Sequence, residues 1–283
     1  MTWWIGVIIA IIVAIIIIFF LFAAFVAYKL VKPSRFVGSW TPKDFGADYE
    51  DIELKTEDGV KLKGWHIKGG ENCVVLLHGY SRSRWDDVYM RKVMGKMWSA
   101  GYSVLAVDFR AHGESEGKYT TLGDKEILDV KAMVKYADQH CKKVYIIGYS
   151  MGGFLALKAA YLGLADRVVA DSPYIYTDKT GARGLKYFAN LPEWLYAFVK
   201  PFAILLSGVK YENTNPFKFA KSIKVPTLII AGKKDPLVKI EEIEEFLKVA
   251  PNVRLWVTEG AHVRSILVNE EDYINKILQF FAQ

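Results

Sequence analysis

Cysteine and histidine are both scarce in this chain of 283 residues. The only two cysteines, Cys73 and Cys141, are too few to suggest a disulfide framework, so we interpret both as small apolar residues at the edges of strands or loops rather than as ligands. Sparse cysteine also favours a reducing compartment. Of the five histidines, His262 alone lies beyond position 150.

Charge is absent from positions 2–28. Within them, Ile5–Phe25 is almost wholly Ile, Val, Phe, Leu and Ala, and a helix of that length covers a hydrocarbon core of about 30 Å. Trp3, Trp4 and Tyr28 stand where interfacial aromatic residues belong. The stretch therefore predicts a membrane-spanning helix.

Two other interpretations of this segment fit less well. A cleaved signal peptide needs a basic start and a shorter apolar stretch, and a buried core helix is disfavoured because no face of the segment is polar. We therefore assign residues 3–28 to a transmembrane helix and residues 29–48, which are punctuated by proline and glycine, to a tether without a core of its own.

Basic residues flank the span on one side only. Nothing basic precedes it except the α-amino group, whereas Lys29, Lys32 and Arg35 follow at once. The positive-inside rule predicts a single-pass membrane protein with everything after the span in the cytoplasm.

The stretch "VYIIGYSMGGFLALKAA" (144–160) contains a Gly-x-Ser-x-Gly pentapeptide centred on Ser150. A β-branched run precedes it and apolar residues at helical spacing follow it, which predicts strand, sharp turn and helix. In such a turn the serine has a strained backbone, and side chains at Gly148 or Gly152 would collide with the adjoining elements. The alternative is a glycine-rich turn with an inert serine.

A nucleophilic serine needs a base, and the base needs an orienting carboxylate. Asp235 follows the predicted strand 227–231, and His262 follows the strand 253–258. Both therefore lie just past the carboxyl ends of strands, where open parallel sheets build their sites. Taken singly, His262 could be a capping or surface residue and Asp235 a turn former before proline; Asp171, at the end of another strand, is an alternative acid.

Strands alternate with helices from position 49 onward. This pattern predicts an α/β fold with a mostly parallel sheet covered by helices on both faces. The expected elements are a hairpin (51–57 and 60–67), strands at 74–77, 102–108, 144–147, 168–171, 227–231 and 253–258, and helices at 85–100, 123–140, 241–249 and 270–281.

Four stretches resemble motifs of the serine α/β-hydrolase family. They are "LLHGYS" (76–81), "VDFRAHGES" (107–115), "GYSMGG" (148–153) and the pair "AGKKDPLV" and "EGAH", and the likeness runs from about position 51 to the C-terminus. The "DFRAHGES" stretch resembles the loop after the fourth strand in monoacylglycerol-lipase-like and lysophospholipase-like members. With its N-terminal span, the chain also resembles the small single-span subgroup, which includes the bem46-like hydrolases and protein depalmitoylases.

The resemblance implies roles for five residues. Ser150 corresponds to the nucleophile, His262 to the base and Asp235 to the orienting acid, while the backbone N–H groups of Tyr80 and Met151 correspond to an oxyanion hole. It implies no metal and no organic cofactor. His78 and His112 lie within the family motifs and are interpreted as structural residues that brace loops.

The segment 174–224 interrupts the alternation after the sixth strand. Eight Lys/Arg stand against three Asp/Glu in it, and it carries eleven aromatic residues. The resemblance implies a helical cap over the active site, between the two parts of the core (49–173 and 225–283). We expect its aromatic residues to line an acyl pocket and its basic residues, such as Lys179, Arg183 and Lys186, to face an anionic leaflet. The alternative is two ordinary helices packed through an apolar stripe.

Together these features predict a membrane-anchored serine hydrolase that cleaves carboxylic esters of apolar acyl groups, of the lipase or esterase type. A protein or acyl-CoA thioesterase is the alternative within the same chemistry, followed by a peptidase or amidase. A membrane adaptor that has kept the fold without catalysis is the alternative outside it. The expected partners are a lipid-like substrate and the bilayer. The serine motif and the span argue against nucleic-acid binding, and no oligomeric state is predicted.

Overall fold

Eight strands form one sheet in the computed structural model, which describes residues 2–283. Their order is β1-β2-β4-β3-β5-β6-β7-β8; β2 is antiparallel to both β1 and β4, and every other neighbouring pair is parallel. This architecture confirms the predicted fold class. The strands are β1 Tyr49–Lys55, β2 Lys61–Ile67, β3 Asn72–Leu77, β4 Ser103–Val107, β5 Lys143–Tyr149, β6 Arg167–Asp171, β7 Thr227–Gly232 and β8 Val253–Thr258.

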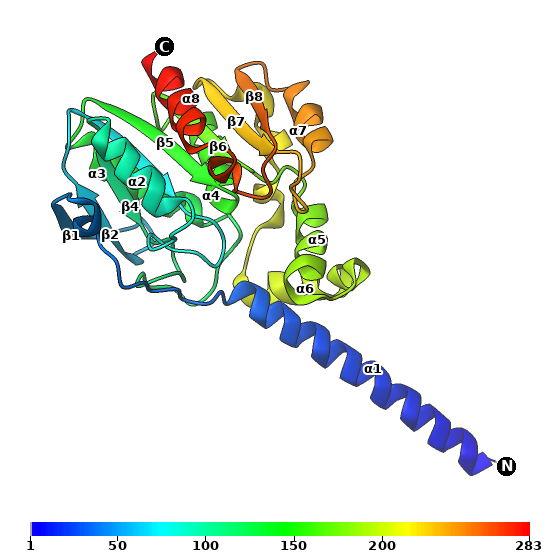
Figure 1. Cartoon of the computed structure of the whole chain (residues 1–283). Coiled ribbons are helices and arrows are strands. Elements are labelled where there is room, and N and C mark those ends of the chain that lie inside the picture. The colour runs from blue at the N-terminus through cyan, green and yellow to red at the C-terminus, as the bar shows by residue number, and fades with distance from the viewer. Residues whose placement is uncertain (1) are drawn as a thin grey trace.

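Helices cover both faces of the sheet, as Figure 1 shows. Successive residues of β3 alternate between two hydrophobic clusters, with Val75 and Leu77 on one face and Val74 and Leu76 on the other. This alternation follows from the two-residue period of a strand that is buried on both sides. The first cluster is covered by α3 Glu126–Asp138, α4 Met151–Leu162 and α7 Ile240–Leu247, and the second by α2 Met90–Ser99 and α8 Glu270–Ala282.

Two helices begin later than the sequence pattern predicts. The helix expected from position 85 starts at Met90, because the Asp86 carboxylate accepts hydrogen bonds from the backbone N–H groups of Val88 and Tyr89 and holds a turn there. The helix expected from position 123 starts at Glu126. Polar side chains compete with helical hydrogen bonds at such starts.

The N-terminal helix α1 (Thr2–Val31) projects from the domain, and the cap lies against its inner end (Figure 1). The cap consists mainly of α5 Thr177–Ala189, the short 3₁₀ helix η2 Glu193–Leu195 and α6 Tyr196–Ser207. Apolar residues of α1, α5, η2 and α6 form a third cluster, which we call the α1–cap cluster; its buried members are Ala23, Val26, Ala27, Val31, Leu185, Leu195, Tyr196, Val199 and Ala203.

Helix α1 continues through residues 29–31, the first three positions of the predicted tether, and the rest of the segment 29–48 lies along the surface of the domain. Trp40 is buried, and its indole N–H donates a hydrogen bond to the Trp85 carbonyl over 2.9 Å. The Arg35 guanidinium donates hydrogen bonds to backbone carbonyls of the loop at 113–117. These hydrogen bonds hold the segment against the domain and restrict the movement of α1 relative to it.

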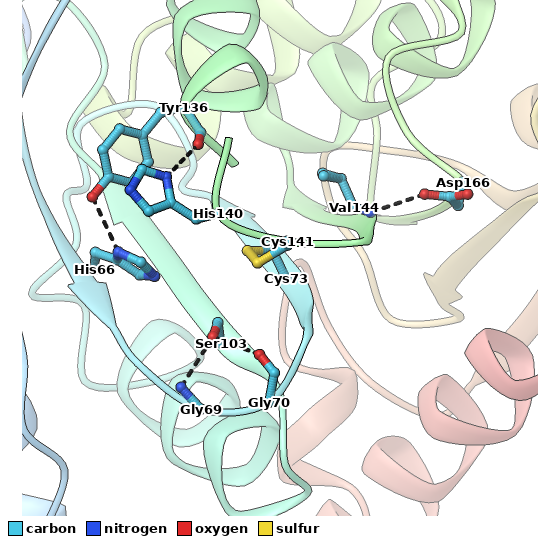
Figure 2. The surroundings of a disulfide bond; sticks show 10 residues. All are labelled: His66, Gly69, Gly70, Cys73, Ser103, Tyr136, His140, Cys141, Val144 and Asp166. Carbon is cyan, nitrogen blue, oxygen red and sulfur yellow. Dashed lines mark hydrogen bonds between the residues drawn. A yellow bond between two sulfur atoms is a disulfide. The ribbon is translucent and has the colours of Figure 1, made fainter. Parts of the chain in front are cut away.

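The structure corrects the interpretation of the cysteines. Cys73 and Cys141 form a disulfide, with 5.7 Å between their Cα atoms (Figure 2). Cys73 is in β3 and Cys141 comes two residues before β5, and these two strands are neighbours in the sheet. A separation of 68 residues hides this proximity in the sequence. The cysteine argument for a cytoplasmic location is therefore withdrawn, and the orientation depends on the basic residues alone.

Candidate active site

Ser150 lies at the junction of β5 and α4, with φ 53° and ψ −109°. This is the strained turn that the pentapeptide predicts. A Cβ on Gly148 would lie 2.0 Å from the Gly152 carbonyl oxygen, and one on Gly152 would lie 2.2 Å from the Leu77 carbonyl oxygen. Both contacts are impossible, so glycine is required at these positions, and the half-buried Ser150 lies in a tight turn at the end of the strand.

The structure brings Ser150, His262 and Asp235 together from three different loops. The Nε2 atom of His262 is 2.9 Å from the Ser150 hydroxyl, and its Nδ1 atom is 2.7 Å from an oxygen of Asp235. Ser150 follows β5, Asp235 follows β7 and His262 follows β8, all at the carboxyl edge of the sheet. The sequence predicted that each residue lies at this edge, and in the structure the three side chains are within hydrogen-bonding distance of one another in sequence, Ser150 to His262 and His262 to Asp235.

The Asp235 carboxylate is held in place by the backbone. One of its oxygens accepts hydrogen bonds from the N–H groups of Leu237 and Val238, at 2.8 and 3.0 Å, which leaves the other for His262. With the carboxylate ionised, the imidazole carries its proton on Nδ1 and presents a free lone pair at Nε2 to the Ser150 hydroxyl. This arrangement is able to remove a proton from the serine.

Asp171, the alternative acid, has other partners. Its carboxylate accepts hydrogen bonds from the hydroxyls of Tyr273 and Ser172, both at 2.8 Å. Burial raises the pKa of Asp171 to about 6. The Ser172 hydroxyl in turn accepts a hydrogen bond from the backbone N–H of Val263 at 3.1 Å, so Asp171 is linked to the loop that carries His262.

Sequence reasoning missed Ser172 and Tyr273. Ser172 follows Asp171 directly and has φ 51°, a conformation that non-glycine residues seldom adopt. The hydroxyl next to a strand-end aspartate was the only signal in the sequence, and Tyr273 gave none because it reads as an ordinary apolar position of α8.

The two predicted oxyanion-hole residues come from different elements, and Gly79, which precedes Tyr80, lies close to Ser150. Met151 is the first residue of α4, so its backbone N–H has no acceptor within the helix. Tyr80 lies in the loop after β3, and its hydroxyl donates a hydrogen bond to the carbonyl of Leu30, near the end of α1, over 2.8 Å. The structure therefore links the Tyr80 loop to the N-terminal helix.

His78 and His112 are both buried within loops, in keeping with a bracing role. The Nε2 atom of His78 accepts a hydrogen bond from the backbone N–H of Phe109 over 2.9 Å, and Nδ1 of His112 donates to the Arg110 carbonyl over 2.8 Å. Burial lowers the pKa of each imidazole, so both rings are neutral.

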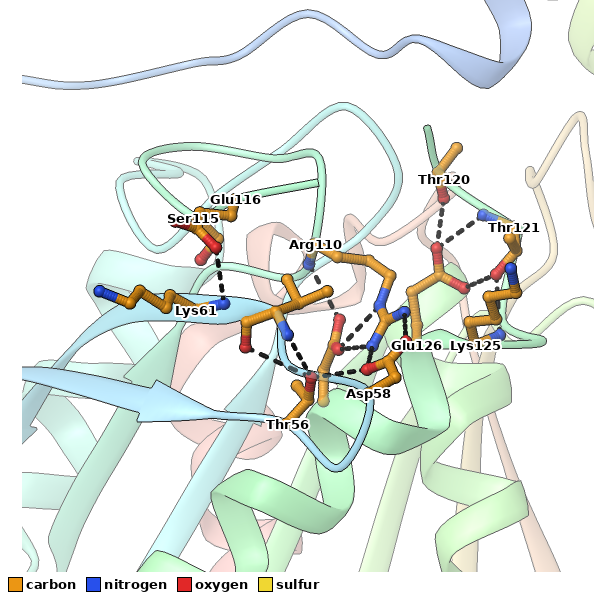
Figure 3. A network of polar contacts seen from close by, with 12 residues as sticks. Thr56, Asp58, Lys61, Arg110, Ser115, Glu116, Thr120, Thr121, Lys125 and Glu126 are labelled. Carbon is orange, nitrogen blue, oxygen red and sulfur yellow. Dashed lines mark hydrogen bonds and ion pairs between the residues drawn. The ribbon is translucent and has the colours of Figure 1, made fainter. Parts of the chain in front are cut away.

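Arg110 fixes the start of the long loop between β4 and α3. Its guanidinium contacts Asp58 in the β1–β2 turn, at 2.7 and 2.9 Å, and Asp129 on α3 at 2.7 Å (Figure 3). The hydrogen bond from Arg110 lowers the pKa of Asp58 to about 2. These ion pairs join a turn, a loop and a helix that are far apart in the sequence.

Glu126 fixes the end of the same loop. Its buried carboxylate accepts hydrogen bonds from the hydroxyls of Thr120 and Thr121 and from two backbone N–H groups (Figure 3). The Thr120 hydroxyl also lies 3.8 Å from the sulfur of Met151, and the Thr120 N–H donates to the Val31 carbonyl over 2.8 Å. The loop thus connects the start of α4 with the end of α1.

Two basic residues of the cap do not project freely, which corrects their expected placement. Arg183 donates hydrogen bonds to the Glu242 carboxylate, at 2.6 and 3.0 Å, and to the Leu237 carbonyl. Lys179 lies 3.7 Å from the same carboxylate. These cations attach α5 to α7 and to the Asp235 loop, because Glu242 offers them an almost fully buried partner. Across residues 2–283, no group of three or more His, Cys, Asp or Glu is arranged to hold a metal ion.

Residues 74–274 match the model of the alpha/beta hydrolase family. The esterase Pf2001 of Pyrococcus furiosus has a similar structure, with a TM-score of 0.79 and 50% sequence identity over 90% of this chain and 98% of that one. The membrane protein YNL320W of Saccharomyces cerevisiae is 24% identical over 90% of this chain and 88% of its own length. The lysophosphatidylserine lipase ABHD12 of Gallus gallus is 26% identical over 90% of this chain and 73% of its own length.

Proposed function

This chain belongs to the alpha/beta hydrolase family, and we propose that it is a serine hydrolase that cleaves carboxylic esters of apolar acyl groups through an acyl-enzyme at Ser150. The observation that carries the proposal is the hydrogen-bonded chain from Ser150 through His262 to Asp235, at 2.9 and 2.7 Å. The Pyrococcus furiosus esterase supports the proposal, because it is 50% identical to this chain over 98% of its own length.

In the first half of the reaction, the Ser150 hydroxyl oxygen attacks the ester carbonyl while Nε2 of His262 takes its proton. The negative charge that develops on the carbonyl oxygen is stabilised by the backbone N–H groups of Met151 and Tyr80. His262 then gives the proton to the departing alcohol as the ester C–O bond breaks. Asp235 stabilises the imidazolium formed in between.

In the second half, water attacks the acyl-enzyme and His262 takes a proton from it. The same N–H groups stabilise the second tetrahedral intermediate. Its collapse breaks the bond between Ser150 and the acyl group, releases the carboxylic acid and returns the proton to Ser150. Every proton moves between Ser150, His262, water and the substrate, so the cycle balances without another reactant.

The proposed substrates are lipid esters with a single acyl chain, such as lysophospholipids or monoacylglycerols. Helix α1 contains a 29-residue candidate span, Trp3–Val31, in which residues 3–28 carry no charge; this uncharged stretch is long enough to cross a bilayer. Two relatives support a lipid hydrolase bound to the membrane: the lysophosphatidylserine lipase ABHD12 and the membrane protein YNL320W. We place the catalytic domain on the cytoplasmic side, because Lys29, Lys32 and Arg35 follow the span.

A fluorophosphonate probe tests the reaction type. We expect it to label the full chain at Ser150 and expect Ser150→Ala to abolish both labelling and hydrolysis of p-nitrophenyl esters, since losing one member of a triad removes many orders of magnitude in rate. Ser99→Ala, at an exposed position at the end of α2, is the matched control and should keep both. Turnover of more than a few percent in Ser150→Ala would contradict the assignment of the nucleophile.

A further inference from the structure

The cap helix α6 packs directly against the inner half of α1. Phe19 of α1 lies 6.2 Å from Trp194 and 5.1 Å from Phe198, measured between ring centroids. Deeper in the contact, Ala23 and Ala27 of α1 are fully buried in the α1–cap cluster. In Figure 1 the cap adjoins the end of α1 that meets the domain.

The contact fixes the level of α6 relative to the span. If Ile5–Phe25 crosses the hydrocarbon, Phe19 lies six residues inside its inner boundary, or about 9 Å at the rise of an α-helix. Residues that touch the Phe19 ring are then at a similar depth. Trp194 and Phe198 cannot stay in water while Phe19 is in lipid.

Helix α6 also contacts Phe20, the residue after Phe19 on α1. Phe198 and Phe202 are one turn apart on α6, yet both lie close to the single ring of Phe20, at 6.2 and 6.4 Å. The turn of α6 from Phe198 to Phe202 therefore lies near the level of Phe20 in the span.

The face of α6 turned away from the protein is apolar. Trp194 is 61% exposed, Phe198 40% and Leu205 80%. Tyr196, Val199 and Ala203 occupy the buried face, so α6 is apolar on both sides. Its single charge, Lys200, is paired with Asp178 at 2.8 Å. A helix that is apolar all round belongs in a protein core or in a bilayer.

We propose that Trp194 of η2 and the outer face of α6, as far as Leu205, are inserted into the same leaflet as the inner half of α1, with lipid acyl chains as their partner. The surface is continuous with that of the span, which is the reason to assign it to lipid rather than to a protein. The proposal rests on the membrane anchoring given above. The cap thus contacts the membrane through apolar side chains, while Lys179 and Arg183 serve contacts within the domain.

Site-directed spin labelling of the full chain in phosphatidylcholine vesicles tests this insertion. Both native cysteines are in the disulfide, so a thiol-specific nitroxide reacts with an introduced cysteine alone. The test positions are Trp194→Cys and Leu205→Cys. Ile17→Cys on α1 serves as the control in lipid and Lys276→Cys, on the exposed face of α8, as the control in water. Collisions with oxygen report lipid, and collisions with a nickel chelate report water.

We expect the oxygen-to-nickel ratio at 194 and 205 to be severalfold higher than at 276 and to approach that at 17. Values at 194 and 205 equal to that at 276, with 17 still in lipid, would overturn the insertion and leave the anchor intact. Strong spin–spin broadening at 205 that vanishes on dilution with unlabelled protein would overturn it in favour of a second copy of the chain. A water-exposed label at 17 would overturn both insertion and anchor, while fluorophosphonate labelling of Ser150 in the same samples reports the hydrolase separately.

Discussion

The hydroxyl of Tyr80 donates a hydrogen bond to the backbone carbonyl of Leu30 over 2.8 Å. Leu30 belongs to the last turn of α1, where the backbone carbonyls find no N–H donor within the helix. The next carbonyl, of Val31, accepts from Thr120. The end of the N-terminal helix is therefore capped by two loops that border Ser150, and one of them supplies a proposed oxyanion-hole N–H.

Replacing Tyr80 with Phe removes this hydrogen bond and keeps both the ring and the backbone N–H. We expect kcat for a short p-nitrophenyl ester to fall by up to about tenfold with little change in KM, because a hydrogen bond of about 1 kcal/mol then no longer positions the loop. Tyr187→Phe, on the exposed surface of the cap, is the matched control. Unchanged kcat in Tyr80→Phe would show that α1 does not position the oxyanion hole.

Asp235 and Asp171 can be ranked by the same amide substitution. Asp235→Asn should lower kcat by about 10⁴, because an amide favours the wrong imidazole tautomer. Asp171→Asn should cost far less, since Asp171 contacts His262 only through Ser172 and the backbone of Val263. Steady-state kinetics of both variants, with circular dichroism as a check on folding, decide the ranking. Equal losses would mean that the triad acid has been misassigned.

Asp171 also makes stability depend on pH. Its folded-state pKa, about 6, exceeds the unfolded value of 3.8, so the buried carboxyl favours the protonated form. Its contribution to stability is complete below pH 3.8 and is lost as the pH rises through 6. The shift of about two pH units corresponds to roughly 3 kcal/mol.

The free energy of unfolding of wild type relative to Asp171→Asn should therefore decrease between pH 4 and pH 8. Denaturant titrations at both pH values measure this difference, and groups common to the two proteins cancel in it. Glu271→Gln, an exposed carboxyl on α8, should give a difference that stays constant. A difference for Asp171→Asn that grows with pH would contradict the raised pKa.

Ala111 has φ 62°, a left-handed conformation that costs a residue with a Cβ about 1 kcal/mol or more. Ala111→Gly should relieve this strain and raise the free energy of unfolding by up to about 1 kcal/mol, after the entropy cost of glycine. Ala106→Gly, in the middle of β4, should destabilise the protein, because no positive φ requires glycine there. Equal destabilisation by both changes would exclude strain at Ala111.

The orientation of the domain depends on Lys29, Lys32 and Arg35. A reporter that is active only outside the cytoplasm, fused after Gln283, should stay silent. Replacing Lys29 and Lys32 with Gln and adding two lysines before Trp3 should increase its activity. A strong signal from the unaltered chain would place the hydrolase domain outside the cytoplasm, where the Cys73–Cys141 disulfide would also form readily.

The sequence by itself determined the features that depend on local physics. Strand and helix periods predicted the sheet and its helices, and the lack of room for a side chain at Gly148 and Gly152 matches the tight turn expected at Ser150. Asp235 and His262 were found because each follows a predicted strand, and the carboxyl ends of parallel strands share one edge. Backbone sterics and hydrophobic period act over a few residues and are therefore visible in the chain.

Only the tertiary structure decided which distant residues meet. The Cys73–Cys141 disulfide, the pairing of Arg183 with Glu242 and the hydrogen bond from Tyr80 to Leu30 join residues that are 50 or more positions apart. The packing of α6 on α1 likewise gave no periodic signal of its own. Such contacts depend on how finished elements pack in three dimensions, and many sequences with the same local pattern would pack them differently.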